Sequence, residues 1–190
     1  ETFRARLLAE GALPPEATLL LGVGRHAPEK RWSMVLEAMM AAGMAHPIGM
    51  ILVGDGRERA RTARLVAGNP HIRLLAPIAD RLALARLMAS CDALVHGCEA
   101  ETFSMVAAEA AASGLPLIAP DRGGAADHAR ANQGWLYRSG DAADAAEVIG
   151  RFIEARAPRP AAAARTMEQH FGDLFALYAA RIAAAPQLAA

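Results

Sequence analysis

The sequence predicts an α/β fold, in which helices cover both faces of a doubly wound parallel sheet of about six strands and give three layers. Short apolar runs alternate with helical patterns along the chain. Strands that are buried on both faces have this near-continuous apolar character. Right-handed crossovers then give a Rossmann-like sheet, which binds ligands at the carboxyl ends of its strands. A length of 190 residues suits one domain, and we expect residues 1–190 to form it.

The expected elements follow from these runs. Strands are predicted at residues 17–23, 47–53, 71–75, 92–96, 115–119 and 134–137. Helices are predicted at residues 31–42, 56–67, 80–90, 104–113 and 141–156. Asp80 and Ser104 stand at positions typical of N-caps, and Gly114 follows the helix that Ser104 begins. The C-terminal tail is predicted to be helical, with a break near Pro158 and Pro160.

Composition excludes several classes of protein. Basic and acidic residues both number 20, so the chain has no overall positive charge with which to hold nucleic acid or an anionic membrane. Two cysteines are too few for a disulfide framework, and no apolar run approaches the roughly 18 residues of a membrane span. We therefore expect a soluble domain of a reducing compartment. The chain begins without Met, which suggests a piece of a longer protein.

The loop after the first predicted strand has the composition of a phosphate-binding site. Gly22 and Gly24 let a ligand approach the backbone, and Arg25 and Lys30 bracket the turn into a helix. Lys30 is the single lysine among the 20 basic residues. A guanidinium and an ammonium beside a helix N-terminus suit a diphosphate, and a solvated loop is the alternative.

A nicotinamide site is a second interpretation of the same loop. Gly22-x-Gly24-x-x-Ala27 matches the dinucleotide fingerprint, which expects an acidic residue about 20 positions further on. The nearest candidate, Asp55, comes 31 residues after Gly24. This spacing counts against a nicotinamide-dependent oxidoreductase without excluding it.

A second polar segment follows the fourth predicted strand. Glu101 lies before the predicted helix, and Glu109 lies within it on an otherwise alanine-rich stretch. Carboxylates accept hydrogen bonds from the hydroxyl groups of a sugar or a ribose. The first amides of the helix, at residues 105–107, are free to bind a phosphate. The alternative is a surface helix with two solvated glutamates.

Taken in order, the motifs resemble those of glycosyltransferase family 4, whose members have the GT-B fold. The spacing of Glu101 and Glu109, followed by Ala-Ser-Gly-Leu-Pro, is similar to the signature of that family. Segments 24–30, 52–56, 121–127 and 132–134 are similar to its other loops, with Asp127 in place of Glu. The resemblance extends over about residues 15–180, and several motifs in order are more specific than one.

The resemblance implies that the chain is a single half of a GT-B enzyme, the C-terminal half that binds the donor. It implies that Arg25 and Lys30 hold the donor diphosphate, that Glu109 binds the ribose and that Glu101 meets the transferred sugar. The catalytic residues it implies are Arg25, Lys30 and Glu101. The nucleotide-sugar-binding residues it implies are Gly24, Arg25, Lys30, Glu101, Thr102, Phe103, Ser104, Met105 and Glu109, with no metal ligand.

The same resemblance implies the reaction and the partners. A retaining, metal-independent transferase passes a hexose from a UDP or GDP donor to an acceptor, without a further cofactor. The acceptor site would lie in a missing N-terminal domain, so the isolated chain should transfer nothing. The C-terminal helices, at about residues 160–184, would pack on that domain through Phe171, Phe175 and Tyr178. The enzyme is expected to be bacterial and cytoplasmic, and any contact with the inner membrane face would belong to the missing half.

Two positions depart from the family pattern. Ser104 stands where the family often has Gly, and a hydroxyl that caps the helix would make this change tolerable. Gly97-Cys98 stands where Pro-Ser is usual, which changes the loop beside the sugar. A relative that kept the fold but lost catalysis is a third interpretation, and the intact charged residues of both motifs argue against it.

Overall fold

The structure, a computed structural model, describes residues 2–155 and 167–184. Six parallel strands form one sheet in the order β3-β2-β1-β4-β5-β6. They are β1 (Thr18–Val23), β2 (Ile48–Val53), β3 (Ile72–Leu75), β4 (Ala93–Val95), β5 (Leu117–Pro120) and β6 (Trp135–Tyr137). The predicted fold class is therefore confirmed. The strand order reverses between β1 and β4, which makes this pair the switch point of the doubly wound sheet.

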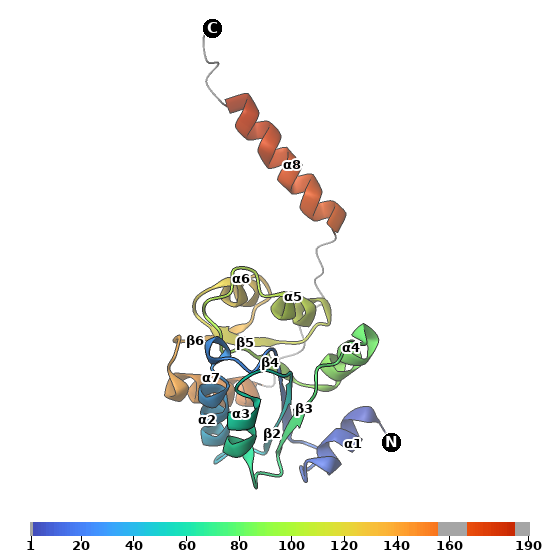
Figure 1. Cartoon of the computed structure of the whole chain (residues 1–190), viewed down its shortest axis with the longest axis vertical. Coiled ribbons are helices and arrows are strands. Elements are labelled where there is room, and N and C mark those ends of the chain that lie inside the picture. Colours follow the sequence, from blue (N-terminus) through green and yellow to red (C-terminus); the bar gives the residue numbers. More distant parts are fainter. Residues whose placement is uncertain (1, 156–166, 185–190) are drawn as a thin grey trace.

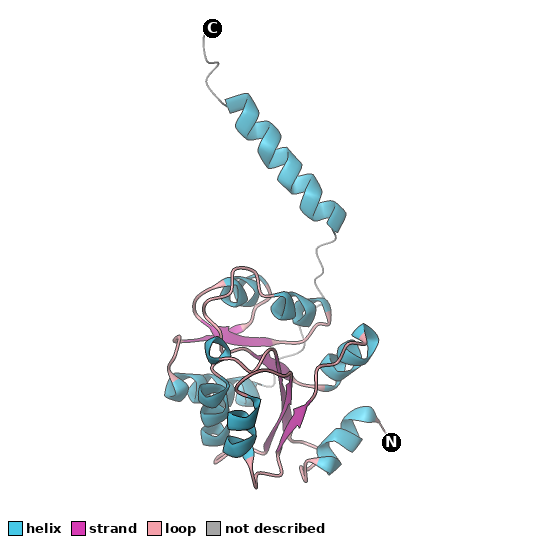
Figure 2. Ribbon diagram, in the orientation of Figure 1, coloured by secondary structure: helices cyan, strands magenta, loops and turns pink. Residues whose placement is uncertain are grey.

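Helices cover both faces of the sheet (Figures 1 and 2). One face carries α2 (Trp32–Ala42), α3 (Arg59–Val66) and α7 (Ala142–Ala155). The other face carries α1 (Phe3–Glu10), α4 (Arg81–Ser90), α5 (Met105–Ala112) and α6 (Gly124–Ala131). A short 3-10 helix, η1 (Pro28–Lys30), precedes α2, and α8 (Met167–Ala184) is the last described helix.

The side chains of β1 divide between two cores because successive residues of a strand point to opposite faces. Leu20 packs with Trp32 in the core under α2 and α7, whereas Leu19 and Leu21 join the opposite core. Burying one such leucine contributes about 1.5–3 kcal/mol. Leu21 also pairs in register with Leu94 of β4, so the carboxyl ends of the two strands lie side by side.

Two helices, α1 and α6, were not predicted from the sequence. Residues 121–127 were interpreted as a loop because they are similar to a loop motif of the family, yet α6 begins at Gly124. The expected cap at Asp80 is confirmed, since its carboxylate accepts hydrogen bonds from the Leu82 amide at 2.8 Å and the Ala83 amide at 3.3 Å.

Helix α8 lies apart from the sheet and its covering helices (Figure 1). The rings of Phe171 and Phe175 stack with centroids 6.0 Å apart, and Phe175 and Tyr178 are 63% and 53% exposed. Packing of this helix on an N-terminal domain stays a prediction. The break predicted near Pro158 and Pro160 lies outside the described residues. Among the described residues, no helix combines the length and apolarity needed to cross a membrane.

Candidate functional site

An open cavity of about 630 Å³ lies at the switch point, beside the carboxyl ends of β1 and β4. The loop after β1 forms one wall, and the β4–α5 loop with the first turns of α5 forms the other. All nine residues that the sequence assigned to donor binding line this cavity, together with Val23, Ala100 and Val106. The topology thus brings together two segments that are about 75 residues apart in the chain.

Lys30 and Glu101 form the ion pair that links the two walls. The Lys30 ammonium donates a hydrogen bond to Oε1 of Glu101, and the two side chains are only 12% and 19% exposed. Burial lowers the pKa of Lys30, chiefly by desolvation of its charged form. The sequence placed both residues in the site but did not predict that they would contact each other.

The close approach of the two walls requires a glycine at position 97. A Cβ atom there would lie 2.5 Å from the Lys30 carbonyl oxygen and 2.8 Å from Cγ2 of Val35. A second ion pair, between the Arg31 guanidinium and Glu99, joins the same two loops. Arg31 has a left-handed backbone, with φ 49°, and this turns the chain from η1 into α2. Sequence reasoning missed this pair, for which the neighbouring charges at 30–31 and 99–101 were the available signal.

Helix α6 supports the Glu101 wall from behind. The Gly124 amide donates a hydrogen bond to the Glu101 carbonyl oxygen at 2.7 Å. A Cβ atom at Gly124 would lie 2.5 Å from the Thr102 carbonyl oxygen, so glycine is needed for this contact. The Phe103 ring meets the His128 ring edge to face, with centroids 4.9 Å apart. The Gly-Gly motif that resembled a family loop therefore fixes the backbone of the site.

Ser104 does not cap α5 as expected. Its backbone is left-handed, with φ 63° and ψ 79°, and its hydroxyl forms no capping hydrogen bond. The hydroxyl oxygen is buried without a hydrogen-bond partner among the described atoms. The Ala107 amide donates to the Ser104 carbonyl oxygen at 3.1 Å, so of the three amides expected to be free, those of Met105 and Val106 are left for a ligand. The left-handed backbone explains why glycine suits this position.

Arg25 and Glu109 lie at the mouth of the cavity. The Arg25 side chain is 78% exposed and pairs with Glu29 at 3.0 Å. Its carbonyl oxygen accepts a hydrogen bond from the Trp32 indole at 2.9 Å, which holds the loop backbone while the guanidinium stays at the surface. Glu109 is exposed on the second turn of α5 and lines the cavity.

His96 extends the site inward beneath Glu101. It is 1% exposed, and its Nε2 atom lies 3.5 Å from Oε2 of Glu101. Burial lowers the pKa of His96 to about 4, and the charge of Lys30 acts in the same direction. The imidazole is therefore neutral at pH 7. The His96 carbonyl oxygen accepts a hydrogen bond from the Tyr137 hydroxyl at 2.5 Å, which fixes the end of β4.

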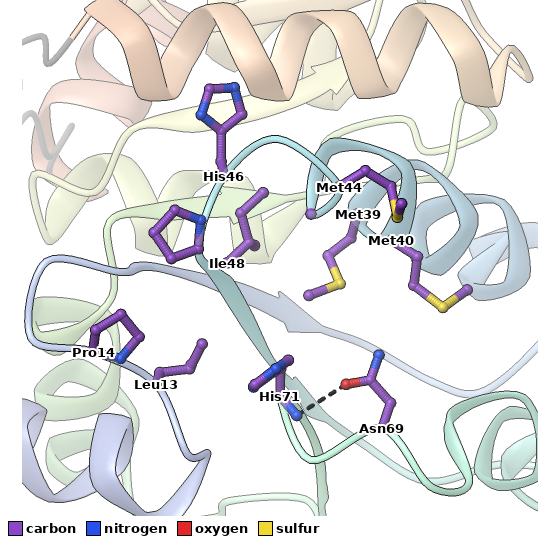
Figure 3. A pocket seen from close by; sticks show the side chains of 11 residues that line it. Leu13, Pro14, Met39, Met40, Met44, His46, Ile48, Asn69 and His71 are labelled. Carbon is purple, nitrogen blue, oxygen red and sulfur yellow. Dashed lines mark hydrogen bonds between the residues drawn. The ribbon is translucent and has the colours of Figure 1, made fainter.

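A second cavity, of about 380 Å³, lies near the amino ends of β2 and β3 (Figure 3). Its walls are largely apolar and include Met39, Met40 and Met44. The imidazole of His71 has a structural role, because its Nδ1–H donates a hydrogen bond to the Gly11 carbonyl oxygen at 2.9 Å. This cavity lacks the converging charged side chains of the first, so the first is the candidate site.

Comparison with known proteins assigns the family. A match to the family of glycosyl transferases group 1 covers residues 4–169. The chain belongs to the glycosyl transferases group 1 family. This membership agrees with the resemblance that the ordered motifs indicated and gives no support to the nicotinamide-dependent alternative.

Two curated relatives show how the length of the chain compares with that of longer proteins. A GDP-mannose-dependent alpha-mannosyltransferase of Mycobacterium tuberculosis (strain CDC 1551 / Oshkosh) is 41% identical over 114 residues, which are 60% of this chain and 28% of that protein. A D-inositol 3-phosphate glycosyltransferase of Nocardioides sp. is 30% identical over 188 residues, 88% of this chain and 40% of that protein. The chain thus spans well under half the length of these relatives.

Solved group 1-like structures share the fold. The crystal structure of Anabaena Alr3699/HepE in complex with UDP and glucose matches with a TM-score of 0.65 at 26% identity, over 80% of this chain and 43% of that one. The glycosyltransferase WaaG, at 23% identity and a TM-score of 0.63, shows the same fold over 80% of this chain. The six-stranded parallel sheet is therefore that of a GT-B glycosyltransferase domain.

Proposed function

We propose that the chain is the donor-binding domain of a retaining, metal-independent glycosyltransferase that transfers a hexose from a nucleoside diphosphate sugar. The observation that carries this proposal is the convergence of Lys30, Arg25, Glu101 and Glu109 on one cavity at the switch point. The location is the one at which doubly wound sheets bind ligands, and the charges suit the parts of such a donor.

The cationic groups and the start of α5 form the diphosphate subsite. Lys30 supplies a compact ammonium, and Arg25 supplies an exposed guanidinium that can swing from Glu29 onto phosphate oxygens. The amides of Met105 and Val106 add the positive end of the helix dipole. Together these groups offset the charge of a diphosphate without a bound metal.

The two carboxylates suit the sugar parts of the donor. Glu109, exposed on α5, can accept hydrogen bonds from the ribose hydroxyls. Glu101, held by Lys30 and by the Gly124 amide, faces the transferred hexose. The fixed backbone around Glu101 orients the hexose relative to the diphosphate, which is the main contribution of a site that lacks a covalent catalyst.

In the proposed transfer, the bond between C1 of the hexose and the diphosphate oxygen breaks, and its electron pair stays with the leaving nucleoside diphosphate. Lys30, Arg25 and the helix N-terminus stabilise the negative charge that develops there. The acceptor hydroxyl attacks C1 from the face that the diphosphate leaves, and its proton passes to a phosphate oxygen. The new bond therefore keeps the anomeric configuration.

The choice of donor is between GDP and UDP sugars. The 41% identical relative is named as GDP-mannose-dependent, and the 26% identical structure holds UDP and glucose. We favour GDP-mannose because of the higher identity. We also propose that a missing N-terminal domain supplies the acceptor site and any contact with a membrane, that no separate cofactor takes part, and that the enzyme is cytoplasmic.

A ligand-observed NMR titration of the chain in EDTA, with GDP, UDP, ADP and NADH in separate samples, tests the proposal. We expect one nucleoside diphosphate to bind, and Arg25→Ala to weaken it. Arg64→Ala, which removes an exposed arginine from α3, is the matched control. Binding of NADH alone, or of no nucleotide, would reject the proposed donor site.

A further inference from the structure

Three metal-ligating side chains meet in the floor of the candidate site. A ring nitrogen of His96, Sγ of Cys98 and a carboxylate oxygen of Glu101 all lie within 4.8 Å of one another. His96 and Cys98 are 1% and 2% exposed, whereas Glu101 borders the cavity and gives an entry path. The Nε2 atom of His96 forms no hydrogen bond among the described residues, although a buried ring nitrogen ordinarily has a partner.

We propose that His96, Cys98 and Glu101 bind a thiophilic divalent cation of the zinc class, and that this ion draws Glu101 away from the transferred hexose. An imidazole, a thiolate and a carboxylate are ordinary ligands of Zn²⁺, with a water molecule able to take the fourth position. Ligand atoms about 2.0–2.3 Å from one tetrahedral ion lie about 3.5 Å apart. His96 and Glu101 are already 3.5 Å apart, so Cys98 needs to move by little more than about 1 Å.

The chemistry of each ligand suits this role. The Nε2 atom of His96 is buried without a hydrogen-bond partner among the described residues, so it is available to a cation. The Cys98 thiol loses its proton to solvent when the metal binds, and the resulting thiolate and the Glu101 carboxylate together balance the charge of the ion.

The ion and the donor hexose compete for the Glu101 carboxylate. Lys30 holds Oε1 of Glu101, and Oε2 faces His96. A bound metal draws the carboxylate inward, away from the hexose, and adds positive charge beside Lys30. The ammonium in turn opposes the metal, so Lys30 weakens metal binding while it strengthens binding of an anionic nucleotide. This part of the inference rests on the proposed function.

Titration of the reduced chain with Cd²⁺, followed by the ultraviolet thiolate-to-metal band, tests the site without an activity assay. We expect one equivalent to bind and Zn²⁺ to displace it. Loss of an outer-shell partner alone costs about 10–100-fold in metal affinity, so Cys98→Ser and His96→Gln should each cost at least that. Cys91→Ser, which alters the other buried cysteine, is the matched control and should bind Cd²⁺ as the wild type does.

Lys30→Met separates this proposal from the proposed function. It should tighten Cd²⁺ binding by about tenfold, because a positive charge is removed and Glu101 is released. Nucleoside diphosphate binding in EDTA tests the donor site alone, because EDTA keeps divalent cations from the metal site. A band that persists in Cys98→Ser, an absent band in the wild type, or unchanged Cd²⁺ affinity in Lys30→Met overturns the metal site, whatever the nucleotide titration shows.

Discussion

The Lys30 ammonium donates a hydrogen bond to Oε1 of Glu101 across the switch point between β1 and β4. With the Arg31–Glu99 pair, it joins two loops that are far apart in the chain. In the proposed function, Lys30 faces the diphosphate and Glu101 faces the hexose.

Replacing Lys30 with Met should weaken nucleoside diphosphate binding by about 1.5–3 kcal/mol, or about 10-fold to 150-fold, because a charge-assisted contact with the diphosphate is lost. Calorimetric titration of wild type and variant measures the change. Arg64→Met, at an exposed position on α3, should leave the affinity unchanged. Equal affinities for wild type and Lys30→Met would show that the ammonium does not contact the diphosphate.

Glu109→Gln should separate a binding role from a structural one. Glu109 is exposed, so the free energy of unfolding should change by less than about 0.5 kcal/mol. If its carboxylate accepts the ribose hydroxyls, the same variant should lower nucleotide affinity by about tenfold. Glu147→Gln, on the exposed side of α7, should change neither quantity. If Glu109→Gln binds nucleotide as tightly as the wild type, Glu109 is a solvated surface residue and does not contact the ribose.

Ser104→Gly should stabilise the fold. The left-handed backbone of Ser104 costs a non-glycine residue about 1–2 kcal/mol, which exceeds the entropy that glycine adds to the unfolded chain, about 0.4–1 kcal/mol. Ser104→Ala removes the buried hydroxyl but keeps the unfavourable backbone, so its free energy of unfolding should lie below that of Ser104→Gly. Urea denaturation of the three proteins gives the order, and a glycine variant less stable than the alanine variant would contradict it.

Gly97→Ala should damage both stability and binding. The added methyl group would lie 2.5 Å from the Lys30 carbonyl oxygen, so the two walls of the site must separate. Such overpacking costs about 1–3 kcal/mol, and the displaced Lys30 should bind nucleotide more weakly. Gly172→Ala in α8 is the control, because a Cβ there meets no atom within 4 Å. Gly97→Ala with wild-type denaturation and titration curves would refute the close approach.

Stability should fall as the pH is lowered from about 6.5 to about 4. His96 has a pKa of about 4 in the folded chain and an ordinary value of 6.5, so the unfolded state binds more protons in this window. The difference amounts to on the order of 3 kcal/mol below pH 4. Urea denaturation across the window, compared between wild type and His96→Gln, isolates this residue from the other groups. If the stability of the two proteins changes in the same way with pH, the claim that His96 is buried in its neutral form is wrong.

The sequence predicted the sheet well because the strand signal is local. The apolar runs that form β1 and β2 are buried along nearly their whole length, so their residue types alone indicate buried strands. Helix α6 was missed because residues 121–127 were assigned to a loop by their similarity to a family motif. A tertiary contact explains the glycine at position 124, since a larger residue would collide with the Thr102 carbonyl oxygen.

The site was predictable as a set of residues but not as a geometry. Ordered motifs named nine of the twelve lining residues, whereas the pairing of Lys30 with Glu101 depends on how closely two distant loops approach each other. Ser104 shows the same limit. A serine before a helix is typical of a cap, but the left-handed backbone at this position turns its hydroxyl away from the helix amides.

The most direct test of the donor site is a ¹H–¹⁵N NMR titration of the chain with GDP, and separately with UDP, followed amide by amide. We predict that the perturbed amides of one titration gather at residues 24–30 and 101–109, around the cavity between β1 and β4. Perturbations centred instead on the second cavity, beside Met39 and His71, or no perturbation by either nucleotide, would contradict the proposal that the switch point binds the donor.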